Sequence, residues 1–193
     1  MALLISFVTY MLTAQPTVPF WDCGEFTAAA VHQQVPHPPG APLFLMLGKV
    51  FHLLPIGDPG WRVNLLSVVS SALSIWLLYF ITVRVIRNFY REDLGDVKNA
   101  LLVYGSGFVG ALAFAFSDTF WFNAVESEVY AASQLFVTLI VWLMMVWHEH
   151  ADEPQAERYL LLITYLIGLS IGVHLLSILT IFSIAGLVYV RKY

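Results

Sequence analysis

Six apolar segments constrain the fold of this chain more than any other feature of its sequence. They run over residues 2–14, 61–86, 100–116, 130–147, 159–173 and 175–190. A helix needs about 20 mostly apolar residues to cross the hydrocarbon of a bilayer. Hydrophobic residues make up 59% of the chain and charged residues 11%, against about 45–50% and about 25% in soluble domains. The sequence therefore predicts an all-α, polytopic membrane protein with about six transmembrane helices in a single domain, residues 1–193.

Two of the segments have uncertain limits. The first is short for a span, so either this helix is tilted or the natural chain begins earlier. The last two form one apolar run that is interrupted at Gly172-Val173-His174. We interpret this interruption as a tight hairpin at one membrane surface. A single kinked segment from Leu160 to Val190 is the alternative.

The basic residues predict the orientation of the spans. If the N-terminus is cytoplasmic, seven basic residues fall at cytoplasmic ends: Arg84, Arg87, Arg91, Lys98, Arg158, Arg191 and Lys192. Only Lys49 and Arg62 then lie outside. Cytoplasmic loops carry an excess of Lys and Arg. We therefore expect a protein of the plasma (inner) membrane whose first outer loop, residues 15–60, faces the periplasmic or extracellular side.

This first outer loop is long for a connection, and long loops are more often functional than accidental. Residues 25–34 are rich in alanine, which favours a helix. Six apolar residues then recur at helical spacing: Leu43, Met46, Leu47, Val50, Phe51 and Leu54. Prolines between the two segments end the first helix. The pattern predicts two helices that lie at the outer membrane interface, joined by a proline-rich turn.

Two carboxylates, Asp22 and Glu25, open this loop. Their spacing brings both side chains to one face of a helix. Partial removal from water at the membrane surface would raise the pKa of a carboxylate, which a general base working near neutral pH requires. The alternative is structural: Asp22 caps the helix and Glu25 completes a capping box. Asp22 and Glu25 are the candidate catalytic residues.

Other polar residues of the predicted outer side are candidates for substrate binding. They are His37, Glu126, Glu128, His174, Arg62 and Lys49. Glu126 and Glu128 lie in the turn before the fourth segment, although a solvated helix start explains Glu126 equally well. His174 interrupts an apolar run, where ionisable groups mark function. Its alternative is a neutral imidazole bonded to a backbone carbonyl. Arg62 and Lys49 are candidate partners for a lipid phosphate.

Several chemistries find little support in the sequence. His32 and His37 could join the carboxylates in a metal site, but no ligand spacing supports one, so we expect neither a divalent metal nor another cofactor. The single Cys23 excludes an internal disulfide and a zinc motif. A net charge of −4 without a basic run argues against nucleic-acid binding.

Three stretches resemble a known family. FWDCGEFTAAAVHQQVPHPPGAPLF, WFNAVESEVYAASQLF and IGLSIGVHLLSIL are similar, in the same order, to motifs of bacterial multi-pass membrane proteins related to protein O-mannosyltransferases. The resemblance covers essentially the whole chain and implies the GT-C glycosyltransferase architecture. It also implies that an acidic residue at the start of the first outer loop is the catalytic base, and Asp22 occupies that position beside Glu25. Because members of the family are longer, it implies that this chain is either the N-terminal part of a longer protein or a reduced version of the family.

The first functional hypothesis is therefore a GT-C-like membrane glycosyltransferase module. It would transfer a mannose-like sugar from a polyprenyl-phosphate donor to an acceptor hydroxyl, on protein or glycan, at the outer face of the membrane. The alternative is a non-catalytic accessory subunit that binds membrane lipid and other membrane subunits of a larger complex. A transporter comes third, because the polar residues cluster at one surface and not at the midplane.

Overall fold

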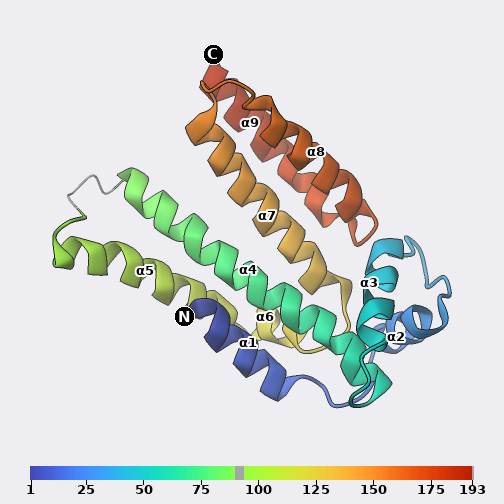
Figure 1. Ribbon diagram of the computed structural model, residues 1–193. Helices are drawn as coiled ribbons and strands as arrows, with labels where there is room; N and C mark the ends of the chain where they lie inside the picture. The colour runs from blue at the N-terminus through green and yellow to red at the C-terminus, as the bar shows by residue number, and fades with distance from the viewer. Residues whose placement is uncertain (90–93, 193) are drawn as a thin grey trace.

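The computed structural model describes residues 1–89 and 94–192, and within these ranges every regular element is helical. The elements are α1 (Ala2–Thr13), α2 (Cys23–His32), α3 (Pro42–His52), α4 (Pro59–Phe89), α5 (Val97–Ala115), α6 (Asp118–Ala124), α7 (Val129–His150), α8 (Glu157–Ile171), the 3-10 helix η1 (Leu175–Leu179) and α9 (Thr180–Lys192). Figure 1 shows their arrangement. The prediction of an all-α protein is confirmed. Arg91, one of the basic residues that set the orientation, lies outside the described residues.

Three of these helices, α4, α5 and α7, are long and apolar enough to cross a membrane. They contain 31, 19 and 22 residues and correspond to the second, third and fourth predicted segments. The other three segments form shorter helices: α1 has 12 residues, α8 has 15 and α9 has 13. By length and composition, the described residues thus contain three candidate spans, where the sequence predicted about six.

The first outer loop is folded, as predicted, and its two helices are α2 and α3. Gly40 and Ala41 have φ angles of 93° and 41° in the turn that precedes α3, a conformation that glycine adopts at little cost. The apolar faces of both helices join α4, α7 and the turn after α8 in one buried cluster, represented by Phe26, Phe44 and Val63. The loop is therefore a small packed layer on the ends of α4 and α7 (Figure 1).

The apolar run at the C-terminus is a hairpin. Helix α8 ends at Ile171, and the chain then turns back through η1 into α9, which lies antiparallel to α8 (Figure 1). The alternative of one kinked segment is wrong. The backbone N–H groups of Leu43 and Phe44 donate to the carbonyl oxygen of Gly172 at 2.7 and 3.3 Å. Because the first N–H groups of a helix lack partners within it, this turn completes the start of α3.

The turn before the fourth segment contains a helix that the sequence analysis missed. Helix α6 lies between α5 and α7 and is followed by the short segment that carries Glu126 and Glu128. The amide of Gln15 donates to the carbonyl of Val125 at 2.9 Å, and the hydroxyl of buried Tyr10 donates to the carbonyl of Ala115 at 2.9 Å. Helix α1 and the residues after it therefore fix the position of this second acidic pair.

Candidate active site

A small cavity collects residues from four distant parts of the chain. Its volume is about 70 Å³, and it is lined by Asp22, Phe26, His37, Pro39, Gly40, Ala41, Glu128, Val129, Tyr130, Val173 and His174. Four of the eight predicted site residues line it: Asp22, His37, Glu128 and His174. They come from the start of α2, the proline-rich turn, the start of α7 and the turn after α8. The fold thus brings one carboxylate of each acidic pair, together with His37 and His174, to one place.

Asp22 stands at the N-cap position of α2, but its side chain does not cap the helix. The preceding residue, Trp21, has a φ angle of 63°, a left-handed conformation that costs a bulky residue about 1–3 kcal/mol. This sharp turn starts α2 while the Asp22 carboxylate stays exposed at the cavity wall. The capping-box interpretation is therefore wrong for this chain.

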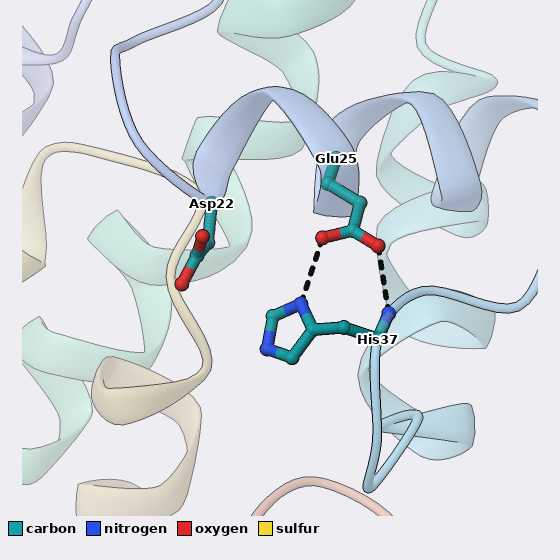
Figure 2. Close-up of side chains that lie close together, drawn as sticks. All are labelled: Asp22, Glu25 and His37. Carbon is teal, nitrogen blue, oxygen red and sulfur yellow. Dashed lines mark hydrogen bonds and ion pairs between the residues drawn. The ribbon is translucent and has the colours of Figure 1, made fainter.

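Glu25 is bonded to His37 and not to the start of its own helix. One carboxylate oxygen accepts from the backbone N–H of His37 at 2.7 Å, and the other lies 2.7 Å from its Nδ1 atom (Figure 2). These bonds lower the pKa of Glu25 and raise the pKa of His37. The expected rise in carboxylate pKa is thus wrong for Glu25, because hydrogen bonds to the charged form outweigh the loss of water. Glu25 fixes the imidazole and the proline-rich turn.

The second acidic pair carries the raised pKa values. Burial, and then the negative charge of Asp22, raise the pKa of Glu128, whose Oε1 atom accepts a hydrogen bond from Sγ of Cys23 at 3.3 Å. Burial and the nearby Glu128 raise the pKa of Glu126 to about 7. Glu126 is only 4% exposed and does not line the cavity. It influences the site through its charge and through its carbonyl, which accepts from the amide of Glu128 at 2.8 Å.

His174 faces the carboxylates across the cavity with a defined tautomer. Its Nδ1 atom accepts from the backbone N–H of Leu176 at 3.2 Å, so the proton of the neutral ring is on Nε2. Its ring lies 5.3 Å, between centroids, from that of Tyr130. The alternative, an imidazole bonded to a backbone carbonyl, is not what Nδ1 shows, because this atom accepts from an amide. Nε2 is left as a donor for a ligand.

Asp22, Glu25 and His37 also form a group with the geometry of a metal site. Each offers one ligand atom, and the three atoms lie within 4.8 Å of one another. His32 is not part of this group. All three residues are exposed, as acidic groups without a metal commonly are, and the Glu25 carboxylate already accepts from His37 at both oxygens. We therefore assign no chemical step to a metal.

Comparison with known proteins agrees with this grouping of motifs. Residues 22–193 match the model of the protein O-mannosyl-transferase TMEM260 N-terminal domain, so the match begins at Asp22. The chain belongs to this family.

Two curated relatives in the TMEM260 family carry the same description. Protein O-mannosyl-transferase tmem260 of Dictyostelium discoideum is 26% identical over 155 residues, which are 79% of this chain and 17% of that protein. Protein O-mannosyl-transferase TMEM260 of Mus musculus is 28% identical over 163 residues, which are 84% of this chain and 21% of that protein. The chain thus spans about a fifth of the length of these relatives. No solved structure matches the chain.

The two outer cations lie apart from the cavity of this TMEM260 family member. The guanidinium of Arg62 donates to the carbonyl oxygens of His52, Ile56 and Gly57 at 2.8–3.2 Å. The Nζ atom of Lys49 donates to the carbonyl of Val31 at 2.6 Å. Both side chains hold the first outer loop together. Their assignment to a lipid phosphate stays a prediction.

Two residues of the site were missed by sequence reasoning. Cys23 was set aside because a single cysteine has no disulfide partner, yet its thiol bonds Glu128. Tyr130 was not among the candidate residues, yet it forms part of the cavity wall. The signal for both was their adjacency to Asp22 and to the second acidic pair within the family motifs.

Proposed function

We propose that this chain is the catalytic N-terminal module of a GT-C-type membrane O-mannosyltransferase. It transfers a mannose-like sugar from a polyprenyl-phosphate donor to an acceptor hydroxyl at the outer face of the membrane. The observation that carries this proposal is the convergence of Asp22, His37, Glu128 and His174 on one cavity in a chain of the TMEM260 family.

In this mechanism Asp22 is the general base. Its exposed carboxylate removes the proton of the acceptor hydroxyl while that oxygen forms a bond to the anomeric carbon. The bond between this carbon and the phosphate oxygen breaks, and the lipid phosphate leaves with the electron pair. Because phosphate is a good leaving group, orientation of the reactants and one base supply most of the rate enhancement.

The other residues of the cavity position the reactants. The bond from His37 to Glu25 holds the imidazole at the wall of the same cavity as Asp22. Burial raises the pKa of Glu128, and a protonated Glu128 carboxyl would donate a hydrogen bond. Nε2 of His174 is a second donor. Together they suit the phosphate or sugar oxygens on which negative charge develops.

The position of the site along the helices supports a location at the outer face of the membrane. The cavity is lined by the start of α2, the proline-rich turn before α3 and the start of α7. Helices α2 and α3 lie at the start of α4 (Figure 1), whereas Arg84 and Arg87 lie near its other end. The positive-inside rule puts the latter end in the cytoplasm. Asp22 then faces the side where a flipped lipid-linked sugar would be presented.

The proposal is tested with the purified full-length protein. We expect label from polyprenyl-phosphate [14C]mannose to appear on extracytoplasmic proteins of the host, and no label when GDP-[14C]mannose is the only donor. Absence of transfer from the lipid donor, together with stoichiometric copurification of another membrane protein, would contradict the proposal and favour the accessory subunit.

A further inference from the structure

A second, larger cavity adjoins the candidate active site. Its volume is about 280 Å³, close to the lower end of the range of about 300–1,000 Å³ for ligand pockets. It is lined by Ser71, Phe114, Ser117, Thr119, Phe120, Asn123, Tyr130, Ala131, Gln134 and Leu176. Tyr130 belongs to the walls of both cavities. The first cavity, at about 70 Å³, holds the volume of only two or so liquid waters at about 30 Å³ each, so a sugar ring needs room beside it.

The lining of the larger cavity is neutral and combines apolar surface with hydrogen-bonding side chains, of which Ser117 and Asn123 already donate to the carbonyls of Phe114 and Thr119. Six of its ten residues carry a hydroxyl or an amide: Ser71, Ser117, Thr119, Asn123, Tyr130 and Gln134. None of the ten is charged, which does not suit a phosphate. The rings of Phe114 and Phe120 lie 4.6 Å apart between centroids. Neutral polar groups next to aromatic rings suit a sugar, whose hydroxyls need partners and whose C–H face packs on rings.

One buried hydroxyl in this wall lacks a partner. Ser71 is fully buried, and its Oγ atom has no hydrogen bond. Elsewhere on the same helix, Ser74 and Thr82 donate to the carbonyl four residues earlier, each at 2.8 Å. A buried hydroxyl without a partner costs free energy that a bound hydroxyl would recover. Ser71 therefore provides an unpartnered hydroxyl on the α4 side of the cavity.

We propose that this cavity, walled by α4, α6 and α7, is a hexose subsite that holds the sugar of the lipid-linked donor. The inference rests on the proposed function, because it takes the donor to be a polyprenyl-phosphate sugar. Tyr130 then lies between the sugar and the catalytic carboxylates. The hydroxyl of Ser71 and the amide of Gln134 select a hydroxylated ligand over the bare lipid chain.

The test is a binding measurement on the full-length protein in detergent, with two probes of equal chain length: short-chain polyprenyl-phosphate mannose and the same polyprenyl phosphate without sugar. Ser71→Ala should weaken binding of the mannosylated probe about three- to tenfold, the value of one hydrogen bond, and leave the bare lipid unchanged. Its melting temperature should stay the same or rise, because no internal bond is lost. Gln134→Leu should shift the two affinities in the same pattern.

Ser133→Ala is the matched control. Ser133 is also fully buried with an unpartnered Oγ atom, but it does not line this cavity, so both affinities should stay as in the unmodified protein. Competition by methyl α-mannoside that is sensitive to Ser71→Ala would support a hexose subsite open to free sugar. A loss confined to the lipid-linked probe would support the donor sugar.

Three results would overturn the inference. Equal weakening of the binding of both probes would assign the cavity to the lipid chain. Unchanged affinities in both variants would show that the cavity has no role in binding. A lower melting temperature with a general loss of binding would show that Ser71 has a structural role. The binding assay is independent of the transfer assay, so the two proposals can fail separately. Sugar-dependent binding in a protein that shows no transfer would contradict the proposed function alone. Transfer without sugar-dependent binding would sink this inference alone.

Discussion

The carboxylates of this site differ mainly in whether their surroundings lower or raise the pKa. Glu25 is exposed and bonded to His37, which lowers its pKa. Glu126 and Glu128 are removed from water, which raises theirs. The charge of Asp22 contributes to the raised pKa values of both His37 and Glu128. The negative charge of Asp22 thus acts on both an imidazole and a carboxyl group of the site.

The pair of Glu25 and His37 predicts a measurable titration. The imidazole of His37 should titrate above its ordinary pKa of 6.5, and Glu25→Gln should return the midpoint toward 6.5. The favourable ion pair is present between about pH 4.5 and 6.5. It is lost as pH rises through the raised pKa of His37, or falls through the lowered pKa of Glu25. Side-chain 1H-15N NMR measures the midpoint, and an unchanged midpoint in Glu25→Gln would contradict the pairing.

We expect buried Glu126 to make the free energy of unfolding depend on pH. Its pKa of about 7 in the fold lies above its ordinary value of 4.5, so folding favours the protonated acid and stability falls as pH rises between these values. Glu126→Gln mimics the protonated form. It should stabilise the fold by about 1–3 kcal/mol at pH 8 and change little at pH 4. Thermal unfolding in detergent at both pH values checks this, and equal effects at the two would contradict it.

At the scale of elements, periodicity predicted more than turns did. The apolar spacing in residues 43–54 was sufficient to predict α3, and alanine content was sufficient for α2. The bond between Glu25 and His37 could not be predicted, because it depends on how the proline-rich turn folds back over α2. Helix α6 was missed because its seven residues are too few for a periodic pattern. The same limit hid the second cavity, whose wall α6 forms.

The contact between α3 and the turn after α8 is tight enough to test. A Cβ atom on Gly172 would lie 3.0 Å from Cβ of Leu43 and 3.2 Å from the carbonyl oxygen of Leu169. Gly172→Ala should therefore separate α3 from the turn and destabilise the protein by about 1–3 kcal/mol. Transfer activity should fall with it, because His174 moves with the turn.

Gly168→Ala, within α8 and four residues before Gly172, is the control for this prediction. A Cβ atom there meets nothing within 4 Å, so the change should not lower the melting temperature. The higher helix propensity of alanine should stabilise the protein by at most about 1 kcal/mol. Thermal unfolding measures the stability of both variants. A similar loss of stability in the two would contradict the proposed contact.

At the scale of the whole molecule, charge and apolar content predicted the class of protein, and the resemblance predicted the family. The number of spans was less predictable. Apolar composition does not reveal where a helix ends, and α8 stops at Ile171 because the chain turns to complete α3. The convergence of residues 22, 37, 128 and 174 required the packing of the first outer loop on α7, which no local pattern encodes.

The orientation across the membrane is open to a labelling test. In a Cys23→Ser background, Gln34→Cys lies after α2 and Glu153→Cys lies between α7 and α8, and both positions are exposed. A membrane-impermeant maleimide should label Gln34→Cys in intact cells and Glu153→Cys only after permeabilisation. The reverse pattern would put the candidate active site in the cytoplasm.

The central claim is that Asp22 is the base of a sugar transfer, and Asp22→Asn tests it most directly. Removing the base should lower kcat for transfer from polyprenyl-phosphate mannose by about 10²–10⁴-fold and leave donor affinity nearly unchanged. Asp118→Asn, an exposed carboxylate outside both cavities, should retain the unmodified rate. Full transfer activity in Asp22→Asn would contradict the account.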